Sequence, residues 1–256
     1  MKIKKKKSPQ SKKTGRKSTK DVLYGAHSII EMLKAKKRSL LSIYTKKPLP
    51  KAWYRIKPYL PKSVPNIQYV TKNVLDGIAE SPEHMGVVAL VAPFKLQKTM
   101  FHSSKKPFIL LLDAIQDVRN LGAILRSAYC AGVDGVVLTQ SKSAPLSAPV
   151  FKASAGLAEH LDIHIASSIK SAIIDIKKAG YSLYMAVTNG KDATKAIYKD
   201  PLCLVIGNEA VGITQEVIKA GEAITIPQRT PDISYNASVA AGILLFLISQ
   251  KKISLL

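Results

Sequence analysis

The chain has 256 residues, of which 46% are hydrophobic, so it can bury one large core or two modest ones and is not globally disordered. Its formal net charge of +22 indicates a polyanionic partner, either nucleic acid or an anionic membrane surface. The two cysteines, Cys130 and Cys203, lie within apolar runs, which predicts buried free thiols in a reducing compartment.

Residues 1–20 form a basic tail in which about half of the positions are Lys or Arg and none is acidic. Repulsion between like charges predicts that this tail is disordered, and we interpret it as a nonspecific phosphate-binding arm, with a solubilising tail as the alternative. The tail lacks the apolar core of a secretory signal, and the apolar stretch at 237–248 is too short for a typical membrane span. We therefore expect a soluble cytoplasmic protein without a membrane partner.

Residues 21–94 are predicted to form a small α/β domain that binds an RNA substrate. Helical spacing in "YGAHSIIEMLKA", "AWYRIKPYL" and "VLDGIAE" alternates with the strand-like runs "LLSIYT", "IQYVT" and "GVVALVAPF". The density of Lys and Arg in this region favours an RNA-facing surface. Residues 95–107 are polar, basic and without periodicity, which predicts a linker.

Residues 108–256 have a different hydropathy pattern. Near-continuous apolar runs, "FILLLDAI", "GVVLTQ", "SLYMAVT", "LCLVIGN" and "AITIPQ", are typical of parallel strands that are buried on both faces. Helices are predicted between and after them, at 121–131, 148–157, 168–179 and 237–250. This order predicts an open α/β domain with a parallel sheet, which binds its ligand at the carboxyl ends of the strands.

Three short motifs carry candidate chemistry, and each has a plain structural alternative. The segment Asn120–Arg126 can be a helix capped near Asn120 with one solvated Arg. In Gly207–Gly212, two glycines bracket a carboxylate at a strand end, which can be a tight turn. Ser234–Ser238 can be the N-cap of the last helix. His160 and His164 lack a third ligand nearby, so no metal site is predicted.

Taken together, the order and spacing of these motifs resemble the three signatures of the SpoU/TrmH methyltransferases, which belong to the SPOUT class. The resemblance covers roughly residues 107–250, and Tyr24–Phe94 resembles the substrate-binding domain of many ribosomal-RNA members. It implies a C-terminal trefoil knot whose loops form the cofactor pocket, and a homodimer that buries the last helix. The implied reaction is methyl transfer from S-adenosyl-L-methionine to a ribose 2′-hydroxyl of RNA.

The resemblance also implies roles for individual residues. The family's catalytic pattern falls on Asn120, Arg126, Glu209 and Asn236. The residues expected to bind the cofactor are Thr188, Asn189, Gly190, Gly207, Ile226, Tyr235 and Ser238. Two positions depart from the family pattern, because Tyr235 stands where Leu is usual and Val118 where Pro is usual.

The expected substrate is a guanosine in 23S ribosomal RNA. The alternatives are a tRNA 2′-O-methyltransferase and a non-catalytic RNA-binding protein on the same fold. No His, Cys or Lys in the motifs is an obvious base. Because a guanidinium stays charged, we expect Arg126 to orient the ribose oxygen and a neighbouring phosphate rather than to remove the proton itself.

Overall fold

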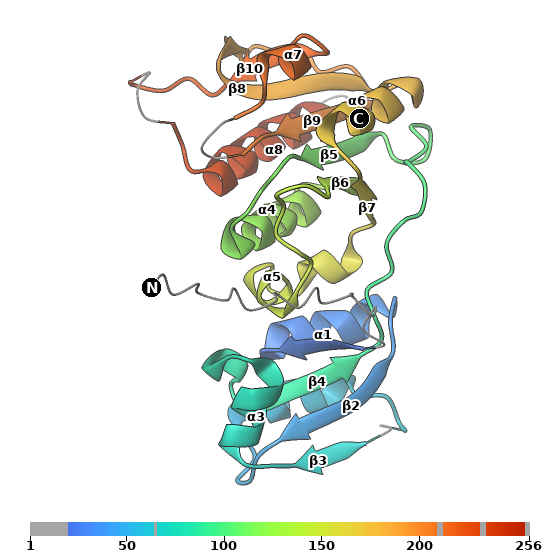
Figure 1. Cartoon of the computed structure of the whole chain (residues 1–256), viewed down its shortest axis with the longest axis vertical. Helices are drawn as coiled ribbons and strands as arrows, with labels where there is room; N and C mark the ends of the chain where they lie inside the picture. Colours follow the sequence, from blue (N-terminus) through green and yellow to red (C-terminus); the bar gives the residue numbers. More distant parts are fainter. Residues whose placement is uncertain (1–19, 64–65, 209–211, 231–233, 254–256) are drawn as a thin grey trace, which may run out of the picture.

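The computed structural model describes residues 20–63, 66–208, 212–230 and 234–253. These residues form two β-sheets with their helices, stacked along the long axis of the molecule (Figure 1). The smaller sheet comes first in the chain, and the larger sheet with its helices contains all three motifs.

The smaller sheet has the strand order β1-β4-β2-β3, in which only β3 runs parallel to its neighbour. Its strands are β1 (Asp21–Tyr24), β2 (Leu40–Thr45), β3 (Ile67–Tyr69) and β4 (Val87–Val91). Its helices are α1 (Ala26–Ala35), α2 (Lys51–Ile56) and α3 (Lys72–Ala79), with the 3-10 turns η1 (Lys57–Tyr59) and η2 (Pro82–His84). Along β2, Ile43 belongs to the same apolar core as Trp53 of α2, whereas Tyr44 packs against the core on the other face that contains Leu75 of α3. The alternation of a strand thus places α2 and α3 on opposite faces.

The larger sheet has six parallel strands in the order β10-β8-β9-β5-β6-β7. They are β5 (Phe108–Leu112), β6 (Gly135–Thr139), β7 (Ile163–Ala166), β8 (Ser182–Asp192), β9 (Leu202–Ile206) and β10 (Glu222–Thr225). Every residue of β5, β6 and β9 is buried, which confirms the prediction of a parallel sheet covered on both faces.

Helices cover both faces of this sheet because the side chains of its strands alternate between them. Leu110 and Leu112 of β5 belong to one apolar core, and Ile109 and Leu111 belong to another. The first core is closed by α4 (Val118–Cys130), α5 (Ala148–Ala153) and α8 (Ala237–Ile253), and the second by α6 (Ile169–Lys178) and α7 (Gln215–Ile218). In the parts of the chain that the structure describes, no helix has both the length and the apolar character needed to cross a membrane.

Several local features differ from the prediction. Helix α4 begins at Val118 rather than near Asn120, because Asp117 is the N-cap and its carboxylate accepts a hydrogen bond from the Arg119 N–H at 2.6 Å. Strands β1 and β7 were not predicted, and in β7 the segment "DIHIA" breaks the apolar pattern. The helix expected at 148–157 ends at Ala153. Cys130 is exposed at the end of α4, although Cys203 is a buried free thiol as expected.

The two sheets are joined through a polar contact that is largely shielded from water. The 3-10 turn η3 (Leu157–His160) follows α5 and lies against α1 of the smaller sheet's domain. Arg38 forms a two-pronged ion pair with Glu159 of η3, and its Nη1 also contacts Asp21 Oδ2 at 2.8 Å. The side chains of Arg38 and Glu159 are 1% and 0% exposed. Charges with little access to solvent therefore help to hold the small domain against the larger one, next to an apolar core that contains residues of both.

Candidate active site

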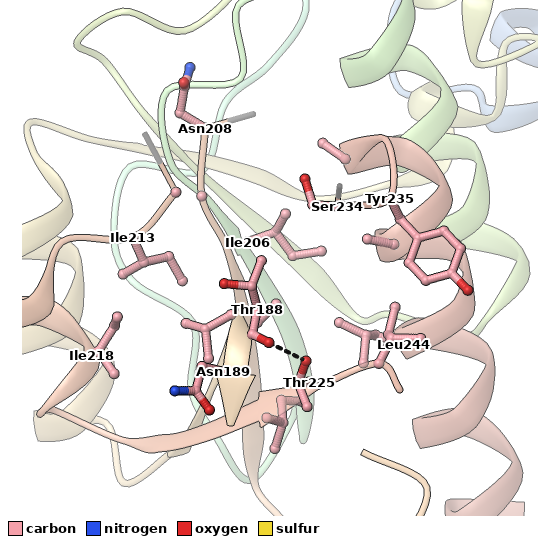
Figure 2. Close-up of a pocket in the computed structure, with 18 of the residues that line it drawn as sticks. Thr188, Asn189, Ile206, Asn208, Ile213, Ile218, Thr225, Ser234, Tyr235 and Leu244 are labelled. Atoms are coloured by element: carbon pink, nitrogen blue, oxygen red, sulfur yellow. Dashed lines mark hydrogen bonds between the residues drawn. The ribbon is translucent and has the colours of Figure 1, made fainter. Parts of the chain in front are cut away.

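A cavity of about 560 Å³ lies where β8, β9 and β10 approach the start of α8 (Figure 2). Its walls come from five separate stretches of chain, which contribute residues from within 186–189, 206–208, 212–218, 224–228 and 234–244. Most of these stretches follow the carboxyl end of a parallel strand, which is where open α/β sheets place their ligands. The cavity is therefore a product of the sheet topology.

The end of β9 requires glycine because two backbone segments meet there. A Cβ atom added to Gly207 would lie 2.6 Å from the carbonyl carbon of Gly212, so no other residue fits without moving the loop. The neighbouring Asn208 accepts a hydrogen bond from the Gly212 N–H at 2.8 Å through its carbonyl oxygen. Its side-chain Nδ2 donates to the Ala114 carbonyl, also at 2.8 Å, and ties the loop to the end of β5. The loop thus holds its backbone close to the cavity.

On the opposite wall, β8 and β10 are linked by side-chain and backbone contacts. Thr225 Oγ1 donates a hydrogen bond to the Thr188 carbonyl at 3.1 Å, and Thr188 and Asn189 line the cavity (Figure 2). Gly190 is not among the lining residues. A Cβ at Gly190 would lie 2.8 Å from the carbonyl carbon of Ala223, so this glycine allows β8 and β10 to approach closely.

Two further predicted residues, Ile226 and Tyr235, line the cavity between β10 and α8. The Tyr235 side chain is 44% exposed, and its ring points away from Ile206 (Figure 2). The substitution of Tyr for the usual Leu therefore leaves the backbone of residue 235 at the cavity and places the aromatic ring at its rim.

Asn236 both caps α8 and contacts the first motif. Its Oδ1 accepts hydrogen bonds from the Ser238 N–H at 2.9 Å and from Ser238 Oγ at 2.6 Å, as expected of an N-cap. Its Nδ2 donates to Asn120 Oδ1 at 3.3 Å and so connects the starts of α8 and α4. Ser238 is engaged by this cap and does not line the cavity. The motif is therefore a helix cap and at the same time a bridge between two of the signatures.

Arg126 is exposed on α4, in the turns that follow Asn120, and is not among the residues that line the cavity. Glu209 lies outside the described residues. Val118 occupies the first position of α4, where Pro is tolerated but not required, so its departure from the family pattern leaves the helix start intact.

Sequence reasoning missed a partly buried carboxyl next to this site. Asp113 directly follows β5, and its N–H donates to the Ile206 carbonyl at 2.9 Å. Burial raises the pKa of Asp113, and a hydrogen bond with Thr139 lowers it in part. Its position at the end of the first buried strand was the only signal of it in the sequence.

Comparison with known proteins agrees with this architecture. A model of the SpoU rRNA Methylase family matches residues 107–246, and one for RNA 2′-O ribose methyltransferase substrate binding matches residues 22–97. A protein of Staphylococcus haemolyticus, provisionally named a TrmH family tRNA/rRNA methyltransferase, is 35% identical over 198 residues, which are 73% of this chain and 78% of that protein.

Solved structures show the same fold. An RNA 2′-O ribose methyltransferase superposes with a TM-score of 0.79 at 22% identity, covering 92% of this chain and 90% of the other. The SpoU methyltransferase AviRb of Streptomyces viridochromogenes, solved in complex with the cofactor AdoMet, superposes with a TM-score of 0.76 at 20% identity, covering 92% and 91%.

The family match over residues 107–246 defines the class as an RNA methyltransferase, here with a parallel sheet. The chain belongs to the SpoU/TrmH family of RNA methyltransferases, and the predicted family is confirmed.

Proposed function

We propose that the chain transfers a methyl group from S-adenosyl-L-methionine to a ribose 2′-hydroxyl of RNA. The observation that carries this proposal is the convergence of Thr188–Asn189, Gly207, Ile226 and Tyr235 on one cavity. The hydrogen-bonded pair of Asn120 and Asn236 lies at the start of α8, which forms one wall of that cavity.

The cavity fits the methyl donor in size and in chemistry. Its volume of about 560 Å³ lies within the range of small-molecule pockets. The apolar side chains of Ile206, Ile213 and Leu244 suit an adenine ring, and the exposed polar residues Thr188 and Asn189 suit the polar ends of the molecule. When bound, the sulfonium supplies an activated methyl group whose leaving group departs uncharged.

The chain's own task is to align the ribose hydroxyl and to help remove its proton. We assign Arg126 to hold the 2′-oxygen and an adjacent phosphate, because a guanidinium offers planar, paired donors and remains charged. Asn236 is held in place by Ser238 and by Asn120, so it can position the ribose without losing its own orientation. Glu209 is assigned a positioning role by the family pattern alone. The proton leaves through phosphate or water.

We propose ribosomal RNA as the substrate, with a guanosine of 23S rRNA as the target. The match of residues 22–97 to a substrate-binding domain and the net charge of +22 support a large polyanionic substrate. A tRNA target is the second candidate, and the name of the Staphylococcus relative mentions both classes of RNA.

The assembly and the cellular setting belong to the same proposal. Helix α8 presents Val239 and Phe246 at 48% and 60% exposure, which supports a homodimer that covers this helix. The knotted threading of the C-terminal segments, which the family pattern implies, and a cytoplasmic location complete the proposal.

The test is transfer of a labelled methyl group from S-adenosyl-L-methionine to total RNA, followed by mapping of the modified nucleotide. The proposal expects a 2′-O-methylated guanosine in 23S rRNA. Incorporation into tRNA alone would show that tRNA, the second candidate, is the substrate. Donor binding measured by calorimetry separates an enzyme from a non-catalytic RNA-binding protein, because the latter would bind RNA without the donor.

A further inference from the structure

The region between Glu31 and Asp76 has an unusual charge distribution. Its 44 residues include 11 Lys or Arg and no acidic residue. Of the 11, eight form no ion pair with any residue that the structure describes: Lys36, Lys46, Lys47, Lys51, Arg55, Lys57, Lys62 and Lys72. A charge that no carboxylate neutralises is available to phosphates.

Exposed aromatic rings lie among these charges, and one of them approaches the larger domain. Tyr59 of η1 is 45% exposed, and the Lys34 Nζ lies 5.2 Å from its ring centroid. The pKa of Lys34 is raised, chiefly by its hydrogen bond to Glu31, with further contributions from the nearby Tyr59 and Tyr129. Tyr129 belongs to α4 and is linked to Lys34 by a chain of contacts through His160 and Glu31.

Tyr129 is fixed in place but keeps an open side. Its ring centroid lies 5.0 Å from that of His160, with the planes tilted by 37°, and the side chain is 41% exposed. His160 Nε2 lies 3.0 Å from Glu31 Oε2, and Lys34 holds the other oxygen of the same carboxylate at 2.8 Å. Both carboxylate oxygens of Glu31 are therefore hydrogen-bonded, and Lys34 balances the negative charge that would oppose a phosphate approaching Tyr129.

The position of Tyr129 on α4 links this cluster to the proposed methyl-transfer site. Arg126 and Tyr129 are three residues apart on the helix and both are exposed, so their side chains are neighbours on its surface. In an RNA strand that lies over Tyr59, Lys34 and Tyr129, the following nucleotide would thus lie at Arg126.

We propose that Tyr59, Lys34 and Tyr129, which we name the tyrosine track, bind an unpaired segment of RNA that crosses from the small domain to α4. The two rings stack on bases. Lys34, paired with Glu31, holds the Tyr59 ring, and the phosphates bind the unpaired cations nearby in the chain, Lys36 and Lys57. The next nucleotide lies at Arg126. Unpaired RNA is the partner because the faces of bases are open to aromatic rings only where the strand is not paired. The direction towards Arg126 rests on the proposed function, whereas the affinity for unpaired RNA does not.

The test is fluorescence anisotropy of the full chain with a labelled oligouridine of about 12 nucleotides and with an RNA duplex of the same length. Tyr59→Ala and Tyr129→Ala are each expected to weaken binding of the single strand about tenfold, as is usual for the loss of one stacked base. Tyr59→Phe and Tyr129→Phe should restore it, since the ring is retained. Binding of the duplex should change much less.

Tyr54→Ala is the matched control, because Tyr54 is a 62% exposed tyrosine of the same domain on α2 and no cation–ring contact involves it within the described residues. A loss at Tyr54 as large as at Tyr59, or an equal loss for duplex and single strand, would overturn the track.

Donor affinity and methyl transfer separate this proposal from the proposed function. Calorimetric binding of S-adenosyl-L-methionine should be the same in the Tyr59→Ala and Tyr129→Ala variants as in the unchanged chain. If the unchanged chain transfers no methyl group but the variants still lose single-strand affinity, the function is wrong and the track stands. If the chain methylates RNA and both variants keep its KM for RNA, the track is wrong and the function stands.

Discussion

Replacing Arg38 by Met tests the contact that holds the two domains together. The substitution keeps much of the aliphatic volume but leaves Glu159, 0% exposed, without its cationic partner. Breaking a buried ion pair by removing one partner costs about 3–5 kcal/mol, because the remaining charge is neither solvated nor paired. Loss of the Nη1 contact to Asp21, whose side chain is 32% exposed, adds little.

The assay is urea unfolding of the full chain, followed by circular dichroism at pH 8 and at pH 5. Burial raises the pKa of Glu159 and the hydrogen bonds from Arg38 lower it only in part, so removing Arg38 should raise this pKa further. A carboxyl whose pKa is higher in the folded state favours folding while it is protonated, and this contribution is lost as the pH rises through that pKa. The loss of stability should therefore be larger at pH 8 than at pH 5.

Two further variants make the result specific. Arg38→Met/Glu159→Met should recover most of the stability, since no buried charge remains. Lys170→Met removes an ion pair with Glu216 whose two side chains are 64% and 72% exposed, and it should cause no clear loss of stability. The reasoning is refuted if Arg38→Met is no more damaging than Lys170→Met, or if its cost does not depend on pH.

Three other outcomes are expected. Gly207→Ala should weaken binding of S-adenosyl-L-methionine at least tenfold in calorimetry, because the alanine Cβ would collide with the loop backbone. Unchanged affinity would mean that the loop does not form the pocket. Arg126→Lys should lower methyl transfer at saturating RNA while donor affinity is kept, and full turnover would remove Arg126 from the chemistry. Burial alone would raise the pKa of Asp162, but hydrogen bonds from Lys37 and Lys106 lower it to about 2. Asp162→Asn should therefore cost about 1–2 kcal/mol at pH 7 in urea unfolding, after allowance for partial exposure. That difference should shrink as the pH falls from about 5 to 2, where the folded carboxyl is about half protonated. A difference at pH 2 as large as that at pH 7 would contradict the ion pairs.

Strands that are buried on both faces were the elements most readily predicted from the sequence. The runs of β5, β6 and β9 are apolar at nearly every position because each strand is buried on both faces, and this predicted the parallel sheet. Strand β7 lies at the sheet edge and carries His164, so its pattern was too weak to detect. The exposure of Cys130 depends on how α4 sits against its neighbours, which local hydropathy does not encode.

Contacts between distant residues could not be derived from local patterns. Asn120 and Asn236 are 116 positions apart, and only the resemblance to a family suggested that they meet. Arg38 and Glu159 are 121 positions apart, and nothing in their local sequence distinguishes them from solvated charges. Asp117 and Asn120 are both suitable N-cap residues for α4. Asp117 is the cap in the structure because its carboxylate accepts a hydrogen bond from the Arg119 N–H.

The central claim is that the cavity between β9, β10 and α8 holds the methyl donor next to Asn236. The most direct measurement is a crystal structure of the chain soaked with S-adenosyl-L-methionine. We expect the donor to lie between Gly207 and Ile226, with its methyl group on the side of the Asn120–Asn236 pair. Donor bound at any other place, with this cavity empty, would contradict the account.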